Sequence, residues 1–90
     1  MAKILKALAR AKSVEILIAL KDGGLKFNQI VEITGNTTTA MRRTRELQTA
    51  GLIGRKVLQD KQRSVEYYLT KKGEKVIPLV KALLGYEKAG

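Results

Sequence analysis

Apolar side chains recur at helical spacing in five parts of the chain and form short alternating runs in three others. A repeat of three to four residues is typical of a helix with one buried face, and a repeat of two is typical of a strand. Glycines interrupt the patterns where turns are expected. The predicted helices span residues 2–11, 14–20, 28–34, 38–50 and 71–84, and the predicted strands span residues 25–27, 52–59 and 64–69.

Polar residues stand immediately before four of the predicted helices. Their side-chain oxygens can accept hydrogen bonds from amides of the first helical turn, which are otherwise unpaired. Gly35 and Asn36 provide a tight turn between the third and fourth helices, and Gly51 ends the fourth. The predicted N-caps are Ser13, Asn28, Thr37 and Thr70.

Two helices joined by a tight turn and followed by a β-hairpin predict a winged helix-turn-helix. The fold class is mainly α with a small β-hairpin wing (α+β). The expected order is helix, helix, short strand, helix, recognition helix, strand, strand, helix. We expect residues 1–90 to form a single winged-helix DNA-binding domain.

The fourth predicted helix has a polar face opposite its core face. At 100° per residue, Thr38, Arg42 and Arg45 point away from the core when Ala40, Thr44 and Leu47 point inward. The N-terminal part of a recognition helix enters the major groove. We therefore expect Thr38, Thr39 and Arg42 to reach base edges and Arg45 to lie nearer the backbone.

The same helix carries two residues with more than one interpretation. Arg43 lies toward the flank, where covering apolar surface and meeting a carboxylate is as plausible as a base contact. Thr37 suits a helix cap, and its hydroxyl beside free amides also suits phosphate. Both are kept as candidate DNA-binding residues.

The hairpin carries the remaining basic candidates. An antiparallel hairpin after a recognition helix extends beside it, so its tip is expected at the neighbouring backbone or minor groove. Charges that merely protect a sheet edge are the alternative interpretation. The candidates are Arg55 and Lys56 at the base of the hairpin and Lys61, Gln62 and Arg63 at its tip.

The charge balance favours a polyanionic partner. The chain has 18 Lys and Arg against 8 Asp and Glu, a formal net charge of +10. Residues 36–63 contain seven of these basic residues and only two acidic ones, Glu46 and Asp60. Five of the seven basic residues are Arg. Arg suits both base edges and phosphates, so the sequence predicts double-stranded DNA as the partner.

The composition argues against several other functions. The chain has no His and no Cys, which removes imidazole acid–base chemistry, Cys and His metal ligands, thiol redox sensing and disulfides. We therefore expect no enzyme activity, no cofactor and no metal. No apolar run approaches the roughly 18 residues of a membrane span, so no membrane association and a cytoplasmic location are expected.

The two ends of the chain are expected to form a homodimer. A 90-residue chain has a marginal core, and the last predicted helix is apolar over more than one face. Residues 1–11 and 71–86 are therefore the expected dimerisation helices. The candidate interface residues are Ile4, Leu5, Leu8, Ile77, Val80, Leu83 and Leu84.

Three blocks of sequence resemble the HxlR-type winged helix-turn-helix regulators, with the MarR and ArsR groups as runners-up. They are Leu25-Lys-Phe-Asn-Gln-Ile, Arg43-Thr-Arg-Glu-Leu-Gln-Thr-Ala-Gly-Leu-Ile and Val65-Glu-Tyr-Tyr-Leu-Thr-Lys-Lys-Gly. The resemblance runs from about residue 12 to 84. It implies a cytoplasmic, dimeric, prokaryotic transcription regulator that dimerises through its terminal helices, with the hairpin as wing.

The chain departs from that family in two ways. Members commonly carry a cysteine near the N-terminus, which is absent here, and this chain is shorter at both ends. Redox control therefore does not carry over, and any small-molecule effector is left open. Two alternative functions also stay open: an architectural or weakly specific DNA-binding chromatin protein, and a winged-helix module that binds protein or RNA.

Overall fold

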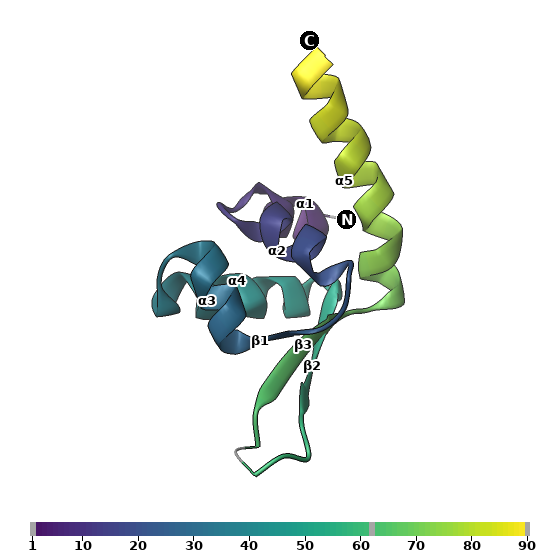
Figure 1. The fold of residues 1–90 in the computed structure, drawn as a ribbon. Coiled ribbons are helices and arrows are strands. Elements are labelled where there is room, and N and C mark those ends of the chain that lie inside the picture. Colours follow the sequence, from purple (N-terminus) through teal and green to yellow (C-terminus); the bar gives the residue numbers. More distant parts are fainter. Residues whose placement is uncertain (1, 62, 90) are drawn as a thin grey trace.

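A computed structural model describes residues 2–61 and 63–89 and confirms the predicted fold class. Five helices surround a small antiparallel sheet, and the β-hairpin and the last helix extend in opposite directions from the body (Figure 1). The elements are α1 (Ala2–Ala9), α2 (Ser13–Leu20), β1 (Leu25–Lys26), α3 (Phe27–Thr34), α4 (Thr37–Thr49), β2 (Ile53–Val57), β3 (Val65–Leu69) and α5 (Lys71–Ala89).

The core is organised around α2, which contacts α1, α3, α5 and β3. Its sequence is apolar on nearly every side, as expected for a helix that other elements enclose. Ile16 and Leu17 are fully buried, and Ile30 of α3, Leu47 of α4 and Leu52 before β2 complete the inner core. The helix-turn-helix and the hairpin therefore share one set of apolar contacts.

The sheet has three strands in the order β1-β3-β2. In addition to the predicted pairing of the two hairpin strands, the short strand β1 pairs with β3. Leu25 lies opposite Tyr67 and Lys26 lies opposite Glu66. On the other side of β3, Arg55 of β2 also lies opposite Tyr67. Tyr67 is buried at the middle of the sheet, and its ring lies 6.3 Å from that of Phe27.

Three predicted caps were wrong, each by one or two residues. Helix α4 is capped by Asn36 instead of Thr37, since the Asn36 side-chain oxygen accepts a hydrogen bond from the Thr39 amide at 2.7 Å. Helix α3 begins at Phe27, and the Gln29 side chain accepts a hydrogen bond from the Lys26 amide, which leaves no capping role for Asn28.

Ser13 is the first residue of α2 instead of its cap. The preceding residue, Lys12, adopts a left-handed conformation with φ of 72°, which closes a tight turn after α1. Ser13 is thereby fully buried, and its hydroxyl has no hydrogen-bond partner within residues 2–61 and 63–89. The local sequence predicted a cap at Ser13 because it does not indicate the left-handed turn at Lys12.

Helix α5 is longer than the apolar pattern predicted. The pattern fades after Leu84, where the predicted helix ended, but the helix runs through Pro78 and on to Ala89. Its N-terminal half packs on α2 and β3, and its C-terminal half extends beyond the body (Figure 1).

The predicted cap at Thr70 is confirmed and also joins the hairpin to α5. Its hydroxyl accepts a hydrogen bond from the Gly73 amide at 3.0 Å and donates one to the Gly51 carbonyl at 2.6 Å. A Cβ atom on Gly73 would overlap the Leu52 carbonyl oxygen. The Leu-Thr-x-x-Gly sequence at 69–73 is thus required by close packing of the first turn of α5 against the start of the hairpin.

We predict that Gly73→Ala lowers the free energy of unfolding by roughly 1–3 kcal/mol, because the added methyl group must displace backbone. Gly85→Ala is the matched control in the same helix. No atom lies within 4 Å of a Cβ placed there, and Ala favours a helix interior by about 1 kcal/mol over Gly. Urea unfolding measures the free energy of unfolding of both variants. A Gly73→Ala variant as stable as wild type would contradict the packing argument.

Candidate nucleic-acid interface

Helix α4 is anchored by one face and exposes the other. Ala40 and Leu47 are fully buried and Thr44 is nearly so, as the helical spacing predicted. The Thr44 hydroxyl donates to the Ala40 carbonyl at 2.9 Å, which satisfies this polar group inside the core. On the opposite side Thr38, Arg42 and Arg45 are exposed. They line a shallow hollow of about 320 Å³ along the helix together with Met41 and Glu46.

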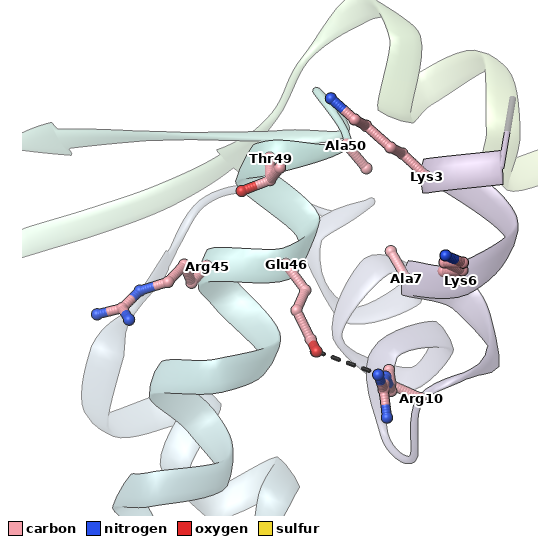
Figure 2. A pocket seen from close by; sticks show the side chains of 8 residues that line it. All are labelled: Lys3, Lys6, Ala7, Arg10, Arg45, Glu46, Thr49 and Ala50. Carbon is pink, nitrogen blue, oxygen red and sulfur yellow. Dashed lines mark ion pairs between the residues drawn. The ribbon is translucent and has the colours of Figure 1, made fainter.

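Arg43 points away from this exposed face, toward the turn between α1 and α2. Its side chain is only 14% exposed. Its Nε atom donates to the Ala11 carbonyl at 2.9 Å, and its guanidinium pairs with Glu46 one turn further along α4. Glu46 also reaches Arg10, whose Nε lies 3.5 Å from its second carboxylate oxygen (Figure 2). This Arg10–Glu46–Arg43 cluster ties the recognition helix to the N-terminal part of the chain.

A groove of about 320 Å³ lies between α1 and the C-terminal half of α4. Lys3, Lys6 and Ala7 come from α1, Arg10 follows that helix, and Ala50 follows α4, while the Arg45 guanidinium points away from α1 (Figure 2). Lys3 and Lys6 were not among the predicted contact residues. Their closeness to α4 depends on the tertiary packing of the two helices.

The adjacent basic residues Arg55 and Lys56 of the hairpin lie on opposite faces of the sheet. Arg55 lines a hollow of about 280 Å³ between α4 and the hairpin, with Arg45, Gln48 and Tyr67 among its other lining residues. Lys56 points to the other face, where its Nζ atom lies 3.2 Å from the Glu66 carboxylate and 5.8 Å from the centre of the Tyr68 ring. The structure therefore brings Arg55, but not Lys56, to the recognition helix.

Asp60 organises the tip of the hairpin. Its carboxylate accepts a hydrogen bond from the Ser64 amide at 3.0 Å, and this bond holds the pKa of Asp60 below its ordinary value. Arg63 adopts a left-handed conformation with φ of 48° and donates its amide to the Asp60 carbonyl. Lys61 and Arg63 are exposed, whereas the predicted contact Gln62 lies outside the described residues.

Met41 was not predicted as a contact residue, although it belongs to the recognition helix and is 50% exposed. It lines the hollow on the outer face of α4 and also the hollow beside Arg55. Helical geometry could have indicated it, because residue 41 falls 100° from Ala40, on the flank. Met41 was missed because the candidate residues were chosen by their polarity and charge.

The residues predicted for a dimer interface divide into two sets. Ile77 and Val80 are buried in the core of the chain itself, and Ile4 and Leu8 pack against it. Leu5 and Leu83 are exposed, and Leu84 is half-buried. Leu79, which was not predicted, is as exposed as Leu83, at 66% against 64%.

Within the described part of the chain, none of the helices has the length and apolar character needed to cross a bilayer. The same residues contain no cluster of three or more His, Cys, Asp or Glu side chains placed to hold a metal ion.

The tight turn between α3 and α4, the exposed face of α4 and the adjoining hairpin define a winged helix-turn-helix. The chain belongs to the HxlR-like helix-turn-helix family, whose model matches residues 8–89. This is a family of transcriptional regulators and not of enzymes, and the resemblance inferred from the three sequence blocks is confirmed.

One relative is an uncharacterized HTH-type transcriptional regulator of Methanothermobacter thermautotrophicus, 43% identical over 75 residues. The match covers 81% of this chain and 57% of that relative, so the chain spans little more than half of its length. Among solved structures, reduced YodB of B. subtilis has a TM-score of 0.83 at 24% identity, covering 96% of this chain and 86% of that one. A candidate transcriptional regulator of Salmonella typhimurium, ytfH, has a TM-score of 0.81 at 28% identity, covering 98% and 80%.

We predict that Arg43→Ala lowers the free energy of unfolding by about 1–3 kcal/mol, because it leaves the Ala11 carbonyl and part of the Glu46 carboxylate without a partner. Arg42→Ala is the matched control, since Arg42 is exposed, and its effect should stay within about 0.5 kcal/mol. Urea denaturation compares the two variants. Equal stabilities would show that the Arg43 contacts do not hold the helix.

Proposed function

We propose that the protein is a prokaryotic transcription regulator that acts in the cytoplasm and binds double-stranded DNA sequence-specifically as a homodimer. The observation that carries this proposal is the exposed row of Thr38, Arg42 and Arg45 on α4, with Arg55 of the hairpin beside it. A helix presented in this way fits the major groove, where Arg can donate two hydrogen bonds to one guanine.

Within this interface, Thr38, Thr39 and Arg42 are assigned to the base edges and Arg45 to the backbone side of the groove. The Thr39 amide is already bonded to Asn36, so its hydroxyl is the group left to contact DNA. Thr37 stands at the first helical position, where the positive end of the helix favours a phosphate. Arg43 becomes a positioning residue because its hydrogen bonds face α1.

The wing supplies backbone contacts that do not depend on sequence. Lys61 and Arg63 are exposed at the end of a hairpin that projects away from the helices (Figure 1). The Asp60 carboxylate accepts a hydrogen bond from the Ser64 amide at 3.0 Å, and this hydrogen bond closes the turn that carries the two basic side chains. Lys56 makes at most a peripheral contact, since Glu66 already pairs with it.

The experiment that tests this function is a set of binding titrations against a selected operator and a scrambled duplex at several salt concentrations. A dimer with about six phosphate contacts should give a log–log slope near −5 against salt, because bound cations release counterions. Arg42→Ala should lose about 1–3 kcal/mol per half-site on the operator and much less on scrambled DNA. Arg63→Ala should weaken both equally and make the slope shallower by about one unit per lost contact.

Other results would support a different function. A flat salt response would contradict DNA binding. Equal losses on both duplexes for Arg42→Ala would favour an architectural protein that holds phosphates without reading bases. Binding to RNA or a protein in preference to either duplex would favour the interaction module.

Dimerisation is proposed from the exposed apolar residues of α5. Leu79 and Leu83 are one helical turn apart in α5 and largely exposed. Exposed apolar residues at this spacing form a stripe suited to a second helix. Leu5 of α1 is also an exposed apolar side chain. Two copies paired through α5 would present two recognition helices to two half-sites.

We predict that Leu79→Glu combined with Leu83→Glu gives monomers at micromolar concentration, because charge would be buried in the pairing surface. These monomers should keep their helical content and bind the operator poorly. Lys75→Glu, an exposed change nearer the start of the same helix, should leave the dimer intact. Sedimentation equilibrium distinguishes the two, and a wild-type protein that stays monomeric at high concentration would refute the dimer.

A further inference from the structure

The recognition helix exposes one large apolar side chain among its polar ones. Met41 is half exposed, while the other apolar residues of α4, Ala40 and Leu47, are fully buried. It belongs neither to the core nor to the cluster that ties α4 to α1. Its position between the row of Thr38, Arg42 and Arg45 on one side and Arg55 on the other puts it inside the proposed DNA surface.

Met41 lies in the N-terminal part of α4, the part that enters a major groove most deeply. Its backbone carbonyl accepts a hydrogen bond from the Thr44 hydroxyl at 3.1 Å, so the main chain at this residue is held in place. The side chain itself is unbranched and adaptable, and it ends in a thioether that makes only weak hydrogen bonds. It can recognise an apolar feature of DNA and little else.

The major groove offers one such feature, which is the C5-methyl group of thymine. Arg42 one residue further along and Thr38 one turn before provide polar contacts to neighbouring bases. A methionine between them adds a contact that no hydroxyl or guanidinium can make. A cytosine, which lacks the methyl group, would leave this side chain without an apolar partner.

We propose that Met41 is a specificity-determining residue that packs on the methyl group of a thymine in each half-site of the operator. The inference rests on the proposed DNA binding and adds to it a chemical reason for preferring one base pair. The competing explanation is that Met41 is a solitary exposed apolar residue of the kind found on any protein surface.

Deoxyuridine provides a test that changes nothing but the methyl group. The full-length protein first selects its operator from random duplexes, and each thymine of the half-site is then replaced singly by deoxyuridine. At one position the wild-type protein should lose about fourfold in affinity per half-site, and about 15-fold when both half-sites are changed, as expected for one buried methyl group. Every other thymine should tolerate the replacement.

The variants then assign this loss to a residue. Met41→Ala should bind the thymine and deoxyuridine operators with the same affinity, whereas Met41→Leu should keep most of the discrimination because its volume and polarity are similar. Gln48→Ala, an exposed change on the same flank two turns away, should keep all of it. Circular dichroism spectra check that each variant folds.

Three results would overturn the inference while leaving DNA binding intact. They are a selected operator without thymine in its half-sites, equal wild-type affinity for every deoxyuridine duplex, and discrimination that survives in Met41→Ala. Salt-dependent binding without any sequence preference would overturn both this inference and the sequence-specific binding proposed above. Failure to bind any duplex would refute both this inference and the proposed function.

Discussion

The structure depends on how firmly α4 is held against the rest of the chain. A base-reading helix must present its side chains from a fixed backbone, because small displacements remove directional hydrogen bonds. Burial of Ala40 and Leu47 holds α4 against the core, but an apolar face alone permits a helix to rotate or slide. The Arg43 hydrogen bond to the Ala11 carbonyl adds a directional contact between α4 and the turn after α1.

That turn has features that only the tertiary structure explains. Lys12 accepts a left-handed conformation and the Ser13 hydroxyl is buried without a partner in the described chain, and both are locally unfavourable. The same turn presents the Ala11 carbonyl to Arg43 and brings Arg10 to Glu46. The local disadvantage is therefore offset by contacts that position the recognition helix. This offset links the beginning of the chain to the middle.

Periodicity predicted much of the fold and of the proposed interface, since it depends only on backbone geometry. The buried face of α4 and the hairpin were confirmed for this reason. The Thr70 cap, predicted from a polar residue before a helix, was also confirmed. Cap positions failed because several polar residues stand close together at each helix start, and the chain path selects among them. The pairing of β1 with β3 and the approach of α1 to α4 join residues far apart in sequence, which no local pattern could indicate.

Neighbouring basic residues show why charge alone could not assign the proposed interface. Arg42 and Arg43 differ by 100° around a helix, and Arg55 and Lys56 lie on opposite faces of a strand. In each pair one residue lies on the surface that the recognition helix exposes, and the other has a carboxylate partner within the chain, Glu46 or Glu66. By pairing with Arg43 and Lys56, these two carboxylates hold one cation of each pair away from the surface proposed to contact DNA. Glu46 and Glu66 thus help to determine which of these neighbouring cations can contact a partner.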